Sequence, residues 1–187
     1  MAFLSQLWLP ILVSGVMVFV ASALVWTMLP HHRTEWQGLP NEAGVIAALK
    51  AGTLAPGLYH FPHPKDEQER RSRAFMDRVS QGPAGYLTII PPRPFTMGPM
   101  MAKAVIFNFV VSFFTAYIAG HVLQLPGAPY LTVFRVVGAI GFMAYAFATV
   151  PDSIWFGRPW RSWCLQAGDA LLYGLLMAGT FGWLWPR

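Results

Sequence analysis

The sequence predicts an all-α integral membrane protein with four transmembrane helices and a small α/β insertion after the first helix. Apolar residues make up 55% of the 187 residues and charged residues only 11%, whereas soluble domains average about 25% charged residues. The charges avoid four long stretches and gather in the segments between them. A run of about 20 apolar residues forms a helix that spans the roughly 30 Å hydrocarbon core of a bilayer.

We divide the chain into a first transmembrane helix within residues 1–30, an insertion over residues 31–101, and three further transmembrane helices within residues 102–187. In the first span, Trp8 and Trp26 lie eighteen residues apart. This is about 27 Å along a helix, which suits aromatic anchors at the two membrane interfaces. The four spans are predicted over residues 6–29, 102–123, 130–150 and 163–185.

The insertion is predicted to contain two helices and two strands. Asn41 is a suitable N-cap for a helix over residues 42–50. A second helix is predicted over residues 64–80, and short strands over residues 57–61 and 86–90. The segment is too small to carry a large core, so we expect a cap against the membrane surface.

The distribution of Lys and Arg predicts the orientation in the membrane. Nine of the 13 lie between Arg33 and Lys103, and Arg158 and Arg161 on the connection before the last span bring one side to 11. The positive-inside rule places this side in the cytoplasm. Residues 31–101 are therefore predicted to be cytoplasmic and both termini periplasmic.

Several functional classes are disfavoured by the sequence. The net charge of +5 does not indicate nucleic-acid binding, because the basic residues of the insertion alternate with acidic ones. The single cysteine, Cys164, permits no intramolecular disulfide and no cysteine-based metal cluster. No phosphate-binding loop, nucleophile elbow, zinc-protease motif or dinucleotide fingerprint occurs. We therefore assign no catalytic residue and do not expect an enzyme.

Small residues recur every four positions in two of the spans, a pattern that lets helix backbones approach closely in a membrane. We expect tight packing within the chain, with a face for a partner helix or pigment, or the lining of a polar path, as alternatives. The packing candidates are Asn108, Ser112, Ala116 and Gly120 in the second span and Gly174, Ala178 and Gly182 in the fourth.

Charged residues near the ends of the spans form a second group of candidates, because ionisable residues in membranes are functional candidates by default. Since they lie toward opposite ends and none lies in the middle, we interpret them as interfacial charges that snorkel and pair locally. They are Arg135, Arg158, Arg161 and Asp169.

Histidines form the third group. His31 and His32 follow the first span, and His60 and His63 lie in the insertion. Imidazoles suit several transition metals, but Pro62 prevents a regular helical arrangement of the second pair, and no acidic residue stands at a recognisable ligand spacing. We predict no metal site and keep these four residues as the candidates for one. His121 is the candidate ligand for haem or a pigment, and such contact is expected only through a partner, since no cofactor of the chain's own is predicted.

Two stretches carry a resemblance to known proteins. Residues 29–33 read LPHHR and lead to LPNE at 39–42, while Phe134-Arg135 lead on to PDSIWFGRPW at 151–160. Together they resemble a family of uncharacterised bacterial inner-membrane proteins with four helices and about this length. The resemblance implies the inner membrane of a bacterium and transfers no activity.

The sequence favours an accessory or structural subunit of a larger bacterial membrane complex, of respiratory or photosynthetic type. Its predicted partners are membrane lipids and other transmembrane subunits, with no nucleic acid. A small oligomeric transporter or channel is the first alternative, for which Asn108, Ser112 and Thr115 would begin a polar midplane. A membrane protein that handles a metal through its histidines is the second alternative.

Overall fold

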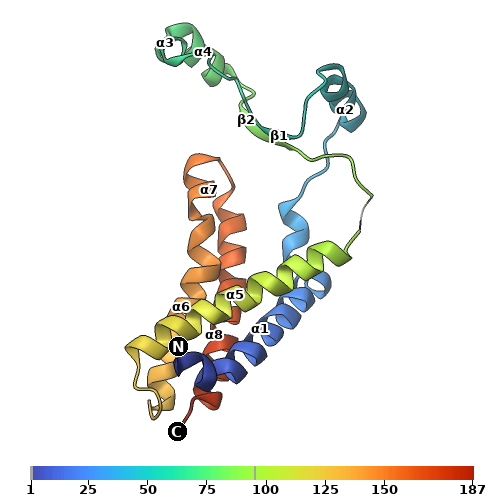
Figure 1. Ribbon diagram of the computed structural model, residues 1–187. Coiled ribbons are helices and arrows are strands. Elements are labelled where there is room, and N and C mark those ends of the chain that lie inside the picture. The colour runs from blue at the N-terminus through green and yellow to red at the C-terminus, as the bar shows by residue number, and fades with distance from the viewer. Residues whose placement is uncertain (1, 95) are drawn as a thin grey trace. The chain divides into compact units, whose positions relative to one another are not determined.

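The computed structural model describes residues 2–94 and 96–187 and is mostly helical. The chain divides into two compact units, described separately below. Unit 1 comprises residues 1–36, 96–154 and 158–187, and unit 2 comprises residues 37–95 and 155–157. Figure 1 shows the elements in chain order.

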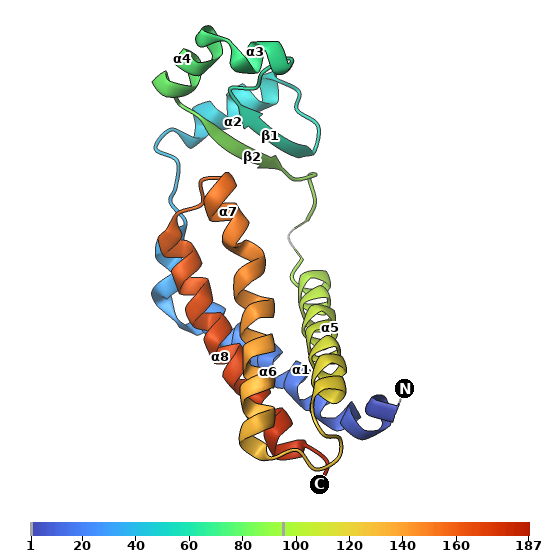
Figure 2. The ribbon, with the colours of Figure 1, turned by 90° about the vertical axis from the view of Figure 1, so that its left-hand side faces the viewer.

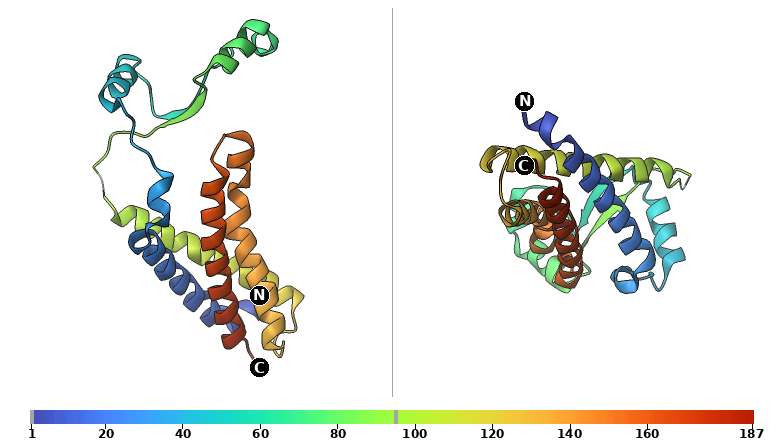
Figure 3. Two further views of the ribbon diagram at one scale, coloured as in Figure 1. Left: turned by 180° about the vertical axis from the view of Figure 1, so that it is seen from behind. Right: turned by 90° about the horizontal axis from the view of Figure 1, so that it is seen from below.

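Unit 1 is a bundle of long helices. They are α1 (Ala2–Met28), α5 (Gly98–Val122), α6 (Tyr130–Ala146) and α8 (Trp160–Leu184). The 3₁₀ helix η1 (Pro30–Glu35) follows α1, and η2 (Phe147–Thr149) and α7 (Val150–Trp155) continue α6. Helices α6 and α8 lie side by side, and α1 packs against both α5 and α8 (Figures 1 and 2). The N- and C-termini lie at one end of this unit and η1 at the other (Figure 3).

Within the described residues, three helical stretches are long and apolar enough to cross a membrane. They are Phe3–Met28, Gly98–Val122 and Tyr130–Trp155, with 26, 25 and 26 residues, and they correspond to the first three predicted spans. Helix α8 also has 25 residues, but its first ten include Arg161, Gln166 and Asp169, and it does not reach the same apolarity. The structure therefore supports a membrane protein, while the fourth span stays a prediction.

The core of unit 1 lies where α1, α6 and α8 meet. Leu7 of α1, Val133 and Val137 of α6, and Met177 and Phe181 of α8 are all fully buried. The apolar faces of the helices thus form one continuous contact, while much of the remaining apolar surface of α1 and α5 stays exposed. An exposed apolar surface of this kind suits a lipid environment.

Helices α6 and α8 approach closely because glycines face each other across the contact. A Cβ added to Gly174 would lie 3.0 Å from both the carbonyl oxygen of Gly138 and the amide nitrogen of Phe142. A Cβ added to Gly138 would lie 3.3 Å from the Cβ of Ala178. A Cβ added to Gly182 would lie 2.7 Å from a ring carbon of Tyr130. All three candidates on α8 thus lie at the contact with α6.

The candidates on α5 lie at contacts with other helices of the bundle. Asn108, Ser112 and Ala116 are buried, and Gly120 faces Phe3 and Leu7 of α1. Two of them take part in interhelical hydrogen bonds. The Asn108 Oδ1 accepts from Tyr145 Oη at 2.8 Å, and the hydroxyl oxygens of Ser112 and Ser14 lie 2.9 Å apart.

Unit 2 contains three short helices and one hairpin. Strands β1 (Gly57–Phe61) and β2 (Gly85–Ile89) pair antiparallel, with Tyr59 opposite Leu87. Helix α2 (Glu42–Ala51) begins at Asn41, whose side chain accepts a hydrogen bond from the Gly44 amide, as the sequence predicts. Among the described residues of this unit only Pro64 is buried. Unit 2 therefore has little core of its own, and a lone two-stranded hairpin is only marginally stable.

The prediction of a single helix over residues 64–80 was wrong. The segment forms α3 (Glu67–Arg71) and α4 (Arg73–Gln81), separated by Ser72. Ser72 has an extended backbone, and its hydroxyl accepts a hydrogen bond from the Phe75 amide. Serine caps a helix better than it continues one, so Ser72 ends α3 and starts α4.

Candidate metal centre

The turn after α1 brings two histidines and a glutamate together. Leu29 is extended and Pro30 occupies the start of η1, where its fixed φ and missing N–H favour the beginning of a helix. Side chains three residues apart eclipse one another in a 3₁₀ helix. His32 and Glu35 therefore lie beside each other, and His31 precedes them in the same turn.

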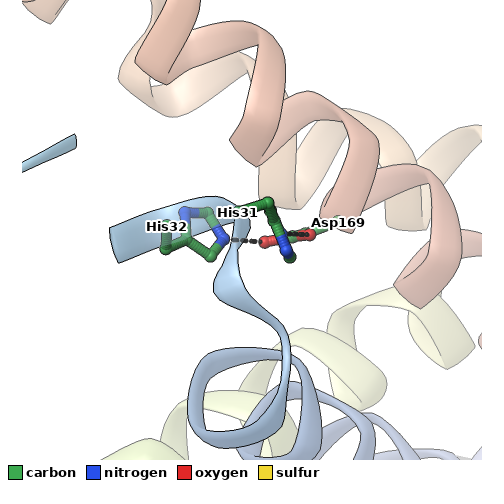
Figure 4. A group of neighbouring side chains, drawn as sticks. All are labelled: His31, His32 and Asp169. Carbon is green, nitrogen blue, oxygen red and sulfur yellow. Dashed lines mark hydrogen bonds and ion pairs between the residues drawn. The ribbon is translucent and has the colours of Figure 1, made fainter. Parts of the chain in front are cut away.

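Both histidines contact one carboxylate on α8. His31 Nε2 lies 3.1 Å from Asp169 Oδ1, and His32 Nε2 lies 2.6 Å from Asp169 Oδ2. Figure 4 shows the two rings on η1 directed at this carboxylate. One ligand atom from each of the three residues lies within 4.8 Å of the others. Two imidazoles and a carboxylate thus converge on one point.

A second carboxylate holds the other nitrogen of His32. His32 Nδ1 hydrogen-bonds to Glu35 Oε1, and Arg158 Nη2 lies 3.5 Å from Glu35 Oε2. The Ser162 hydroxyl also hydrogen-bonds to Glu35, and Arg158 Nη1 donates to Gln166 Oε1 at 3.0 Å. The His32 ring is therefore fixed at both nitrogens, with Nε2 aimed at Asp169.

Helix α8 supplies its part of the cluster from one face. Ser162, Gln166 and Asp169 recur at spacings of four and three residues, which places them on one side of a helix. Ser162 lies in the first turn of α8, where the free backbone amides and the helix dipole favour a negative charge. Glu35, which Ser162 contacts, lies at this favourable end.

The cluster is shielded from water except on one side. The side chains of His32, Glu35 and Asp169 are 4%, 8% and 11% exposed, whereas that of His31 is 29% exposed. The indole of Trp26 stacks on the His32 imidazole, with ring centroids 4.0 Å apart and planes 4° from parallel. Access from solvent is therefore past His31.

Burial and charge act in opposite directions on this cluster. Burial alone would lower the pKa of His32, but hydrogen bonds and charge from Glu35 and Asp169 outweigh it, so that its pKa lies above the ordinary value of 6.5. Burial would raise the pKa of Glu35, but His32, Ser162 and Arg158 lower it below its ordinary value. The cluster thus favours a positive charge at His32 and keeps Glu35 ionised.

His31, His32 and Asp169 form a group that could hold a metal ion. Ligand atoms about 2.1 Å from a tetrahedral ion lie about 3.4 Å apart, so the contacts of His31 and His32 with Asp169, at 3.1 and 2.6 Å, would have to widen by about 0.3 and 0.8 Å. A metal-binding histidine usually donates its other ring N–H to a carboxylate, as His32 does to Glu35. Arg158 balances Glu35, which leaves the negative charge of Asp169 for the two imidazoles and a cation.

Of the residues singled out in the sequence, the structure brings together His31, His32, Asp169 and Arg158. Arg161 and Arg135 are exposed, and neither has a carboxylate partner among the described residues. The interpretation of the charges as locally paired therefore fits Asp169 and Arg158. Glu35, Ser162 and Gln166 complete the cluster and had no place among the candidates.

The remaining histidines have other surroundings. In unit 2, His60 Nε2 and His63 Nδ1 lie 2.9 Å apart, and both side chains are exposed. His121, at the end of α5, hydrogen-bonds through Nδ1 to the Tyr117 carbonyl oxygen and packs beside the rings of Phe3 and Tyr117. None of these three has a carboxylate partner in the part of the chain that the structure describes.

Comparisons with models of known protein families, with curated proteins and with solved structures gave no match.

Proposed function

We propose that this chain is a four-helix membrane protein that binds one divalent transition-metal ion through His31 Nε2, His32 Nε2 and the Asp169 carboxylate. One observation carries the proposal. The Nε2 atoms of both imidazoles meet a single carboxylate, while Glu35 holds the opposite nitrogen of His32. Two imidazoles and one carboxylate suit Zn²⁺ and Fe²⁺.

The proposed site leaves part of the coordination sphere free. Three protein ligands are typical of zinc sites that keep a fourth position for water or another molecule. The partly exposed His31 provides an approach from the aqueous side. We therefore infer that the ion is handled at this end of the bundle, where it can be loaded and released, rather than enclosed as a purely structural ion.

The proposed topology has α8 as the fourth span, within the division into residues 1–30, 31–101 and 102–187. The start of α1 and the end of α8 lie at one end of unit 1, which supports an even number of crossings. At 25 residues, α8 is about 37 Å long, enough to cross, and its polar side chains gather near its first turns. Arg33, Arg158 and Arg161 flank the η1 end, which favours a cytoplasmic metal centre in a bacterial inner membrane and periplasmic termini.

The test is a measurement of metal binding to the purified full chain. Protein in mild detergent is stripped with a chelator, dialysed and titrated with Zn²⁺ against a competing indicator dye. We expect one tightly bound ion per chain. The double variant His31→Ala/His32→Ala is expected to lose this ion, whereas the matched double variant His60→Ala/His63→Ala retains it. Absence of binding to the unmodified chain, or its loss only in the second variant, would overturn the proposal.

An accessory subunit of a larger membrane complex is the second candidate function, and unit 2 favours it. Apart from Pro64, none of its described residues is buried, and Leu58 and Ile90 are 84% and 64% exposed. Such surface suits contact with a partner subunit. Purification from native membranes in mild detergent tests this candidate. A stoichiometric partner that is lost when Leu58→Asp is introduced would support it, and a chain that purifies alone would count against it.

The transporter alternative has less support. Asn108 and Ser112, which would begin a polar path, are engaged by Tyr145 and Ser14 in interhelical hydrogen bonds. Such bonds contribute to helix association in membranes and leave these side chains less free to coordinate a moving ion. A proteoliposome assay of divalent-cation flux tests it, and flux above that of empty vesicles would revive it.

A further inference from the structure

A shallow groove runs along the outer side of the α6–α8 pair, toward the end of unit 1 that carries the termini. Its volume is about 280 Å³. It is lined by Phe134, Arg135, Ala139 and Phe142 of α6 and by Leu171 and Leu175 of α8. Apart from one arginine, these side chains are apolar.

The close approach of the two helices accounts for the shape of the groove. Gly138 also lines it and adds no side chain, because α8 packs directly against its backbone through Ala178 and Gly174. The larger rings of Phe134 and Phe142 stand one turn before and one turn after it. The result is a furrow with a backbone floor and apolar walls, a lining that suits a hydrocarbon chain.

Arg135 lies near one end of this furrow. It is exposed, and no described Asp or Glu forms an ion pair with it. It is five residues from Tyr130, where α6 begins, or about 7.5 Å along the helix. The exposed Trp183 near the end of α8 lies at the same end of the pair, because the neighbouring Gly182 faces Tyr130, and tryptophan is enriched at the headgroup level of membranes. An arginine at this depth extends its guanidinium toward the headgroups.

We propose that the furrow binds one anionic phospholipid. The phosphate pairs with the Arg135 guanidinium, which suits bidentate phosphate recognition, and one acyl chain lies along Gly138 and Ala139 toward Phe142 and Leu171. An anionic headgroup is favoured because the site offers a cation and, among the described residues, no carboxylate for the ammonium group of a zwitterionic lipid. A partner helix would have to bring a carboxylate of its own to Arg135.

This site shares no residue with the proposed metal centre. The metal ligands belong to η1 and to the first half of α8, whereas the groove involves α6 and the middle of α8. Lipid binding can therefore be measured on protein stripped of metal with a chelator. A negative result would remove the lipid site and leave the metal proposal untouched.

The test is native mass spectrometry of the full chain in detergent, titrated with phosphatidylglycerol or phosphatidylcholine of the same acyl composition. We expect one phosphatidylglycerol to bind at least about tenfold more tightly than phosphatidylcholine. Arg135→Gln is expected to remove this preference, and Arg187→Gln, which removes the same charge at the same end but outside the groove, to retain it.

A second variant tests the groove without changing charge. Ala139 is exposed, so Ala139→Phe fills the furrow without entering the core and is expected to weaken phosphatidylglycerol binding severalfold. Equal binding of both lipids by the unmodified chain, or an unchanged preference in Arg135→Gln, would overturn the proposal. Unchanged binding in Ala139→Phe would equally overturn the placement of the acyl chain.

Discussion

The chain contains two histidine pairs, and their surroundings differ. His31 and His32 lie beside two carboxylates, and His32 is almost fully buried. His60 and His63 are three positions apart, a spacing often examined as a metal-binding pattern, yet they are exposed and hydrogen-bond to each other. In the described chain, carboxylates converge on the pair that lacks a metal-binding spacing.

The difference teaches that a metal site depends on what fixes the ligands. Two free imidazoles on a surface must be oriented by the ion itself, at a cost in conformational entropy. The first pair is oriented in advance, because η1 holds its backbone, Glu35 holds His32, and Asp169 arrives on a long helix. Preorganisation of this kind is what outer-shell partners supply to a metal site.

The largest effect should come from the carboxylate that only the first pair has. Asp169→Asn keeps the shape of the side chain but removes its charge, and we expect Zn²⁺ affinity to fall about 100-fold or more, since outer-shell changes alone cost 10–100-fold. The matched control, Asp77→Asn in the exposed part of α4, should leave affinity unchanged. Competition titration measures both, and equal affinities for the two variants would erase the distinction between the histidine pairs.

A smaller effect is expected from the residue that orients His32. Glu35→Gln still contacts the ring but accepts its N–H less strongly, so we expect a loss of Zn²⁺ affinity of about 10–100-fold. Glu42→Gln, in the first turn of α2, is the control and should bind as the unmodified chain does. If Glu35→Gln binds normally, Glu35 serves only the fold of η1.

The pH dependence of stability distinguishes protonation of His32 from metal binding by His32. Because the pKa of His32 is raised, its protonated ring stabilises the metal-free fold at pH values below the ordinary pKa of about 6.5. This stabilisation is lost as the pH rises through the raised pKa. Glu35, whose pKa is lowered, stays ionised between pH 6 and 8 and adds no slope there. The metal-free chain should lose this stabilisation as the pH rises above about 6.5.

Zn²⁺ should reverse this slope, because an imidazole must be neutral to bind a metal and the bound ion stabilises the fold in proportion to its affinity. Thermal unfolding in detergent at pH 6 and 8, with and without Zn²⁺, measures both slopes. The ring faces Asp169, Glu35 and, beyond Glu35, Arg158. If His32→Gln keeps the same two slopes, other groups carry them and the account of His32 is wrong.

The smallest effect on the metal is expected from the packing that supports α8. Gly174→Ala places a Cβ 3.0 Å from the backbone of Gly138 and Phe142, so the helices must separate, which costs about 1–3 kcal/mol of unfolding free energy. Gly179→Ala, which meets nothing within 4 Å, should be neutral or slightly stabilising. Unfolding by SDS in mixed micelles compares the two, and equal stabilities would show that the α6–α8 contact yields easily. We expect at most a severalfold loss of Zn²⁺ affinity in Gly174→Ala.

The elements that follow from local patterns were predictable, and the cluster proposed to bind a metal was only partly so. Apolar runs indicate α1, α5 and α6, and the strand predicted over residues 57–61 coincides with β1. The break at Ser72 depends on one side chain that caps a helix instead of continuing it. Asp169 lies 137 residues from His32, and no local pattern announces their contact. Glu35 had a usable signal, because Pro30 starts a short turn in which residues three apart eclipse.

X-ray absorption spectroscopy of the zinc-loaded chain tests the central claim most directly, because it reports the identity and distance of the ligand atoms. We predict nitrogen and oxygen ligands at about 2.0–2.1 Å, with outer-shell scattering from two imidazole rings that disappears in His31→Ala/His32→Ala and persists in His60→Ala/His63→Ala. A sulfur ligand at about 2.3 Å, or imidazole scattering that disappears only in the second variant, would contradict the account.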